Sequence, residues 1–231
     1  MKDAPSPNQD NRPSTPPNTP IDVLMLHYTG MQTAQAAIDR LRDPAARVSS
    51  HYVVDEDGTT WRLVPEARRA YHAGISYWRG HRTLNDRSIG IEIVNPGHEW
   101  GYRPFPAAQM DAVRTLCLGI LSRHPIPPRN VVGHSDVAPD RKRDPGELFD
   151  WRGLAQVGIG LWPEAASEPV APHAVHATLT EIGYPVPDLR TALAAFQRRW
   201  RPARIDGEAD AETRERLAAV SALLARPIPE T

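Results

Sequence analysis

Two histidines and an aspartate have the identities and positions expected of a metal site. His27 ends the apolar run Ile21-Asp-Val-Leu-Met-Leu-His27, and His134 ends a second run, Val131-Val-Gly-His134. Residues at the carboxyl ends of buried strands lie at the edge of an open α/β sheet, where such sheets bind ligands. Asp144 follows in a loop after His134. Three nitrogen and oxygen ligands leave zinc a fourth position for water, the catalytic rather than the structural arrangement. The sequence therefore predicts a zinc hydrolase with one ion per chain.

Two charged residues could perform chemistry beside such an ion. Glu92 is the only charge in the otherwise apolar or small stretch 88–95, which alternates as a strand does. Burying a lone carboxylate is costly, so Glu92 calls for a partner such as a metal-bound water, whose proton it could accept. Gly90, one pleat away on the same face, would leave space beside it. Lys142 precedes Asp144 by two residues and could hold its ammonium over an oxyanion of the substrate.

Apolar patterning predicts the strands and helices that position these residues. Strands are expected at 21–27, 51–55, 59–64, 88–95 and 131–134, with a short helix at 33–43 and a long helix at 106–124. Glu56-Asp57-Gly58 is a hairpin signal between the second and third of these strands. Cys117 falls in the apolar stripe of the longer helix, which makes it a core residue. An α/β domain over 21–163 follows from this pattern.

The two ends of the chain differ from this domain. Residues 1–20 are proline-rich and polar, and are expected to form a disordered tail without a secretion signal. Residues 164–173 have the composition of a linker with few contacts to its surroundings. Residues 174–226 contain helical patterns that predict a small three-helix domain around one aromatic core.

Composition excludes some partners. The formal net charge of -1 gives no field that favours nucleic acid or anionic lipid. Arginines cluster at positions 198, 199, 201 and 204, a run that is typical of a solvated helix face. No run approaches the ~20 apolar residues of a membrane span. The sequence does not predict an oligomeric state.

Motifs in the order of one enzyme family run through the predicted α/β domain. They are Leu26-His-Tyr-Thr-Gly30, Ser50-His-Tyr-Val-Val54, Tyr71-His-Ala-Gly74, Ser88-Ile-Gly-Ile-Glu-Ile93, Gly133-His-Ser-Asp-Val-Ala-Pro139 and Arg141-Lys-Arg-Asp-Pro-Gly146. This chain resembles the zinc-dependent N-acetylmuramoyl-L-alanine amidases of the type 2 amidase family over about 21–162. The resemblance implies a mixed β-sheet flanked by helices, as in amidases and peptidoglycan recognition proteins. It also implies zinc ligands at His27, His134 and Asp144, a catalytic Glu92 and a catalytic Lys142.

The implied reaction is hydrolysis of the amide bond between N-acetylmuramic acid and L-alanine, in peptidoglycan or in its muropeptide fragments. Two alternatives remain at this point: a non-catalytic peptidoglycan-binding module, and a zinc peptidase that cuts within the stem peptide. The segment after the linker resembles a three-helix peptidoglycan-binding domain. A chain without a secretion signal is expected in the cytoplasm, whereas a wall-binding segment favours the periplasm or cell envelope.

Four further residues are candidates for contact with the substrate. His72 could line the cleft or only pack its loop. Trp78 could stack on sugar or peptide, or only cover the core. Asn85 and Arg87 precede the Glu92 strand and could position the substrate.

Overall fold

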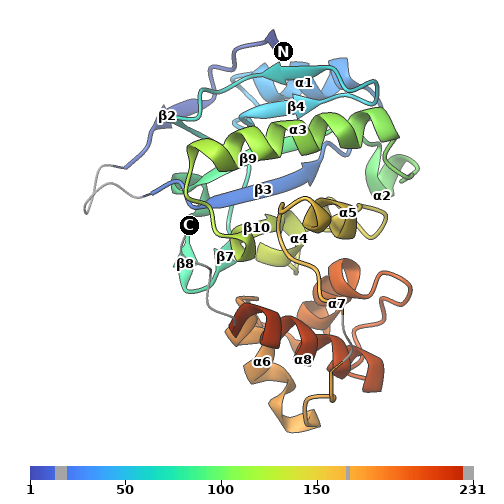
Figure 1. Ribbon diagram of the computed structural model, residues 1–231. Coiled ribbons are helices and arrows are strands. Elements are labelled where there is room, and N and C mark those ends of the chain that lie inside the picture. Colours follow the sequence, from blue (N-terminus) through green and yellow to red (C-terminus); the bar gives the residue numbers. More distant parts are fainter. Residues whose placement is uncertain (14–19, 165–166, 226–231) are drawn as a thin grey trace.

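A computed structural model describes residues 1–13, 20–164 and 167–225 of the 231-residue chain. A six-stranded mixed sheet with helices on both faces forms its centre (Figure 1). The strands lie in the order β1 (Lys2–Asp3), β5 (Thr60–Arg62), β4 (Tyr52–Val54), β9 (Ser88–Ile93), β3 (Val23–Tyr28) and β10 (Val131–Gly133). Only β4 and β5, the predicted hairpin, are antiparallel neighbours. The expected mixed sheet flanked by helices is confirmed.

The register of three parallel strands determines where the site forms. β9 pairs with β3 so that Glu92 lies directly beside His27. β10 pairs with the other side of β3, and its last residue, Gly133, lies opposite Leu26. His134 therefore follows at the same edge of the sheet. It begins the short helix α4 (His134–Val137) instead of ending the strand, because Asp136 accepts a hydrogen bond from the Gly133 amide and caps the helix.

The two faces of the sheet pack against different helices. Helix α3 (Ala107–Arg123) covers one face, where Cys117 is buried among residues of β3 and β9. Helix α1 (Ala34–Arg42), capped by Thr33 as predicted, covers part of the other face. The remaining elements are α2 (Gly97–Trp100), α5 (Trp151–Gln156), the two-stranded pairs β2 (Gln9–Asn11) with β6 (Arg68–Ala70) and β7 (Tyr77–Trp78) with β8 (His81–Arg82), and the 3-10 turns η1 (Leu84–Asp86), η2 (Pro128–Asn130) and η3 (Pro172–Ala174). His27 and Glu92 face away from α3, so the site opens on the opposite side of the sheet.

The N-terminal segment packs against the sheet. The prediction of a disordered tail over 1–20 is therefore wrong for residues 1–13, and residues 14–19 lie outside the described part. β1 adds a parallel strand beside β5, and β2 pairs antiparallel with β6. The Arg12 guanidinium donates hydrogen bonds of 2.8 Å to 3.0 Å to the carbonyl oxygens of Glu66, Asp86 and Ser88. These strands pair through backbone hydrogen bonds, and the polar side chains of the segment gave no pattern from which a strand could be predicted.

The C-terminal segment forms three helices, α6 (Val175–Ile182), α7 (Leu189–Trp200) and α8 (Ala211–Ala225). They share one continuous apolar core with the sheet, in which Phe196 and Leu217 join Val23 and Met25 of β3. The expectation of few contacts between this segment and the rest of the chain is therefore wrong. Residues 165–166 of the expected linker and residue 226 lie outside the described part. No helix in the described ranges has the length and apolarity that a bilayer span requires.

A buried ion pair fixes α7 to α4, the short helix that follows β10. Arg199 Nη1 lies 2.7 Å from Asp136 Oδ2, and the two side chains are only 4% and 1% exposed. The Tyr184 hydroxyl donates a 2.6 Å hydrogen bond to the other oxygen of Asp136. The guanidinium also lies 4.1 Å from the ring centre of Trp151. The predicted solvated arginine face is thus wrong for Arg199 and for the buried Arg201, although Arg204 is exposed.

Replacing Arg199 by methionine is expected to lower the free energy of unfolding by about 3–5 kcal/mol, because Asp136 would keep a buried charge without its partner. For a chain of this size, the loss corresponds to a fall in Tm of about 6–20 °C. Thermal unfolding followed by circular dichroism measures it. Arg190→Met, at a 71% exposed position on the same helix, is the matched control and should unfold as the wild type does. Equal Tm values for the two variants would contradict the structural role of Arg199.

Candidate active site

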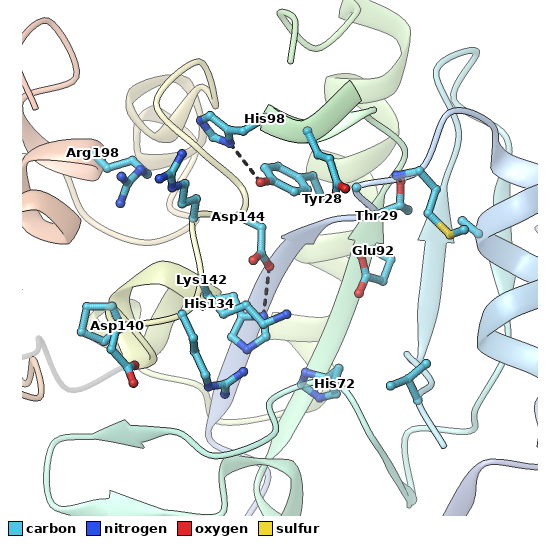
Figure 2. Close-up of a pocket in the computed structure, with 18 of the residues that line it drawn as sticks. Tyr28, Thr29, His72, Glu92, His98, His134, Asp140, Lys142, Asp144 and Arg198 are labelled. Atoms are coloured by element: carbon cyan, nitrogen blue, oxygen red, sulfur yellow. Dashed lines mark hydrogen bonds and ion pairs between the residues drawn. The ribbon is translucent and has the colours of Figure 1, made fainter. Parts of the chain in front are cut away.

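A cavity of about 980 Å³ opens at the carboxyl ends of β3 and β9 (Figure 2). Four of the five residues predicted to act in catalysis line it: Glu92, His134, Lys142 and Asp144. The fifth, His27, lies behind them and is fully buried. Residues from three separate parts of the sequence therefore meet at this edge of the sheet, as expected from their positions at or after the ends of predicted strands.

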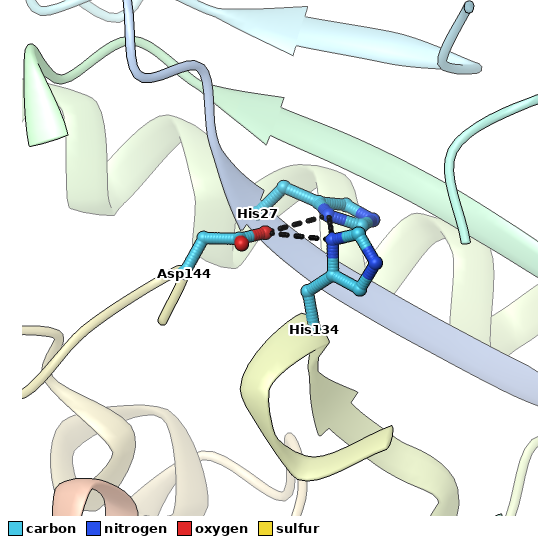
Figure 3. Close-up of side chains that lie close together, drawn as sticks. All are labelled: His27, His134 and Asp144. Atoms are coloured by element: carbon cyan, nitrogen blue, oxygen red, sulfur yellow. Dashed lines mark hydrogen bonds and ion pairs between the residues drawn. The ribbon is translucent and has the colours of Figure 1, made fainter. Parts of the chain in front are cut away.

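Three potential metal-ligand atoms converge beside this cavity (Figure 3). His27 Nδ1 lies 3.0 Å from His134 Nδ1 and 2.9 Å from Asp144 Oδ2, and the last two atoms are 3.1 Å apart. A hydrogen bond from the Ser135 amide to the Asp144 carbonyl oxygen, 2.9 Å long, holds the Asp144 loop against α4. All three side chains are buried.

Hydrogen bonds fix which nitrogen of each ring carries the proton. His134 Nε2 lies 3.1 Å from the carbonyl oxygen of Ala73, which can only accept, so Nε2 donates. In a neutral ring, Nδ1 of His134 then has no proton. Its lone pair points toward the other two ligand atoms.

A longer chain of hydrogen bonds does the same for His27. The Ser88 hydroxyl donates to the Leu84 carbonyl over 2.6 Å, so its oxygen accepts from His72 Nε2 at 3.1 Å. His72 Nδ1 is then an acceptor, and His27 Nε2 donates to it over 3.1 Å. Burial lowers the pKa of His27 to about 4 and lowers the pKa of His72 well below its ordinary value, which keeps both rings neutral. His27 Nδ1 is therefore also without a proton.

The donor set fits a bound cation. When both rings are neutral, two bare nitrogen atoms and a carboxylate oxygen face one another at 2.9 Å to 3.1 Å, an arrangement that a shared cation would stabilise. Tetrahedral zinc, with bonds of about 2.0–2.1 Å, separates its ligand atoms by about 3.3 Å. Among the described residues, these three form the only cluster of potential metal ligands.

Gly90 provides the room for this arrangement, in a way the sequence did not predict. The space beside Glu92 is filled by the His72 ring, since a Cβ on Gly90 would lie 2.6 Å from His72 Cγ. Asn85 supports the same ring, because its side-chain oxygen accepts hydrogen bonds from the amides of His72 and Ala73. Gly90 is thus required for close contact and not for an unusual backbone conformation.

Gly90→Ala is expected to displace the His72 ring and to weaken metal binding about 10–100-fold, the loss typical of a disturbed partner of a ligand. Competition with a chromophoric chelator measures the metal affinity directly. Gly119→Ala, on helix α3 beside a flexible arginine side chain, is the matched control. An unchanged affinity in Gly90→Ala would show that the His27–His72 contact does not support the ligand.

Glu92 is half-buried, and one of its carboxylate oxygens lies in an unusual environment. Its Oε2 atom has no hydrogen-bond partner in the part of the chain that the structure describes. Burial and the nearby charge of Asp144 raise its pKa well above the ordinary value, while Lys142 opposes the shift. A carboxyl group that is easily protonated and borders the cavity can take up and return a proton.

The other predicted substrate contacts lie in different surroundings. His72 lines the cavity. Trp78 is 4% exposed and packs edge-to-face against Tyr184 of the C-terminal segment. Arg87 forms an ion pair with Asp22. Neither these two nor Asn85 reaches the cavity lining.

The sequence did not indicate one wall of the cavity, which helix α7 provides through Arg190, Thr191, Ala194 and Arg198. His98, which was not among the candidate site residues, also lines the cavity and accepts a hydrogen bond from the Tyr28 hydroxyl over 2.9 Å. Only the folding of distant segments onto one another brings these residues to the site.

Comparison with known proteins agrees with this chemistry. A family model described as N-acetylmuramoyl-L-alanine amidase matches residues 17–147. The chain belongs to this family. The matched stretch contains His27, His134 and Asp144, the three candidate ligands, together with Glu92 and Lys142. This amidase is 42% identical to the N-acetylmuramoyl-L-alanine amidase AmiD of Escherichia coli over 222 residues, which cover 84% of the chain and 79% of AmiD.

Two solved structures resemble almost the whole amidase. The complex of AmiD from E. coli with anhydro-N-acetylmuramic acid-L-Ala-D-gamma-Glu-L-Lys has a TM-score of 0.80 at 39% identity, covering 92% of this chain and 93% of that one. AmpDh3 from Pseudomonas aeruginosa, in complex with anhydromuramic pentapeptide, has a TM-score of 0.83 at 32% identity, covering 93% and 96%. The chain is an enzyme that hydrolyses the amide bond between N-acetylmuramic acid and L-alanine.

Proposed function

We propose that this amidase binds one zinc ion through His27 Nδ1, His134 Nδ1 and Asp144 Oδ2. The observation that supports it is the pair of bare nitrogen atoms fixed by His72 and by the Ala73 carbonyl. When bound, the ion would supply a Lewis acid for the scissile carbonyl and a water of lowered pKa.

Glu92 and Lys142 then divide the proton transfer and the charge stabilisation. Glu92, opposite His27 in the sheet, accepts the proton of the attacking water and returns it to the nitrogen of the departing L-alanine. Lys142 lines the cavity near His134 (Figure 2) and places a positive charge where the amide oxygen becomes negative. The raised pKa of Glu92 suits this role, because the group must hold the proton between the two steps.

Metal analysis tests the ligand set. The purified wild type should contain one zinc per chain, and chelation should abolish hydrolysis until zinc is restored. His134→Ala should lose the metal. His124→Ala, which changes a histidine paired with Glu66 away from the cavity, should keep it. Stoichiometric zinc in His134→Ala would refute the proposed site.

The substrates we propose are soluble muropeptides, including those that carry an anhydro sugar. The support is the pair of relatives above, whose structures contain such compounds. Mass spectrometry of the products tests the bond that is cut. The amidase should release the intact stem peptide with a free L-alanine amino group, whereas cleavage within the stem would leave L-alanine on the sugar.

We further propose that helices α6 to α8 help the amidase to bind polymeric peptidoglycan, as the resemblance of this segment suggests. Because these helices share the core of the sheet, deleting them cannot isolate their contribution. Inactive Glu92→Gln protein should instead be bound to intact sacculi in the presence of saturating soluble muropeptide. Retention would support a wall contact outside the cavity, and complete release would refute it.

A further inference from the structure

Helix α7 contributes a cation to the catalytic cavity from outside the stretch that matches the amidase family. Arg198 lines the cavity, whereas the family match ends at residue 147. Figure 2 shows its side chain in the same cavity as Tyr28, His98 and Asp144. The neighbouring Arg199 points into the core and fixes the helix through Asp136, so the position of Arg198 is set by a buried anchor.

The Arg198 guanidinium has no adequate partner within the described chain. Its side chain is only 12% exposed, and its Nε atom is buried without a hydrogen bond. The nearest carboxylate, Glu147, is 3.7 Å away and already accepts hydrogen bonds of 3.1 Å from His98. The Nε–H donor is therefore buried without an acceptor, which is costly, while the side chain lines the cavity that a ligand would enter. This state is expected of a group whose acceptor arrives with a ligand.

A second free cation lies in the same cavity. Arg143 lines it and, within the described ranges, makes neither a hydrogen bond nor an ion pair. Burial lowers the pKa of Arg198, Glu147 opposes this, and the charge of Arg143 lowers the pKa further, so the two guanidinium groups act on each other. Arg141 differs from both, because the carbonyl oxygens of Ala73 and Ile75 accept its hydrogen bonds.

We propose that Arg198, together with Arg143, binds a carboxylate of the substrate's stem peptide, and that the C-terminal helices thereby take part in recognising the scissile substrate. A planar guanidinium matches a carboxylate with two parallel hydrogen bonds. A stem peptide linked through the γ-carboxyl of D-glutamate keeps the α-carboxylate of that residue free, and it ends in a second carboxylate. The inference rests on the amidase activity and adds to it a substrate contact outside the family match.

Binding to three synthetic substrates tests the inference in zinc-loaded, inactive Glu92→Gln protein, where turnover does not interfere. The first is anhydro-N-acetylmuramyl-L-Ala-γ-D-Glu-L-Lys with both carboxylates free. The second carries a carboxamide at the D-glutamate α-position, and the third carries one at the C-terminus. Calorimetry gives each Kd before and after Arg198→Met.

Arg198→Met should weaken binding of the first substrate about 10–100-fold, the loss typical of a charge-assisted hydrogen bond. One of the two carboxamides should weaken binding to Arg198-containing protein to the same extent, and this identifies the carboxylate concerned. Arg198→Met should then bind that carboxamide and the free acid equally well. Arg198→Lys should retain part of the discrimination, and Arg216→Met, on α8 outside the cavity lining, should retain all of it.

Two results would overturn the proposal. One is an unchanged Kd for all three substrates in Arg198→Met. The other is that Arg198→Met raises the Kd of all three compounds by the same factor, so that each carboxamide still binds more weakly than the free acid by the wild-type ratio. That result would mean that Arg198 only supports the cavity wall. Failure of the wild type to hydrolyse the first substrate would count against the proposed substrate. The Kd values of the inactive variant do not depend on hydrolysis, so they would still test the role of Arg198.

Discussion

Glu92→Gln is expected to lower kcat for hydrolysis of the muramyl amide about 10²–10⁴-fold, the usual effect of removing a general base. Glutamine preserves the shape of the side chain, but it cannot accept the proton of the attacking water. The three ligand atoms belong to other residues, so the variant should bind zinc with wild-type stoichiometry. Steady-state kinetics on a soluble muropeptide, with metal analysis of the same sample, measures both properties.

The metal-free form of Glu92→Gln should be at least as stable as the metal-free wild type. Burial raises the pKa of Glu92, so ionisation of this group opposes folding, and stability is lost as the pH rises through its titration. Glutamine removes that unfavourable charge. Glu181→Gln, on the exposed side of α6, is the control for both measurements. Activity of Glu92→Gln within a few-fold of the wild type would place the base elsewhere.

Ending the chain after Trp162 is expected to abolish cooperative folding, and activity with it. The sequence alone predicted the opposite, a folded catalytic domain. The structure places Val23 and Met25 of the sheet in the same apolar core as the three C-terminal helices, and truncation would expose these side chains to water. It would also leave Asp136, two residues from the proposed ligand His134, without Arg199 and Tyr184.

Far-UV circular dichroism, thermal unfolding and zinc content of the truncated chain measure this effect. Arg199→Met in the full chain serves as the comparison, because it removes the ion pair while leaving the shared apolar core in place. We expect a graded series, in which the point variant is destabilised and the truncated chain lacks a cooperative transition. A truncated protein that unfolds cooperatively with wild-type kcat would show that the shared core is dispensable.

The sequence predicted those parts of the fold that local patterns determine. The strand that ends at His27, the Glu92 strand and the α3 helix have side chains whose period matches their structure, so these elements were expected at nearly their observed bounds. The ligand set and Glu92 meet as expected because parallel strands bring their carboxyl ends to one edge. His134 starts a helix because Asp136 caps it, and this capping contact could not be foreseen from the local pattern.

Other features depend on contacts between distant segments. Nothing local distinguishes Arg199, which is buried between two indole rings, from Arg204, which is exposed five residues later in the same cluster. β1 and β2 are two and three residues long and are held by backbone pairing. Their polar side chains have no apolar alternation that would predict a strand. The sequence left His72 between lining the cleft and only packing its loop; it lines the cavity, and its contact with His27 is a further role that the sequence did not indicate.

The anchoring of α7 has a consequence for how the cavity can move. One wall of the cavity belongs to the sheet and the other to α7, and the Arg199–Asp136 pair joins the second wall to the helix that begins with His134. Hinge closure around a substrate would have to break this buried contact. We therefore expect the cavity to have the same width in the free and the substrate-bound enzyme. Folding of the chain would then set this width, and the width would limit which substrates enter.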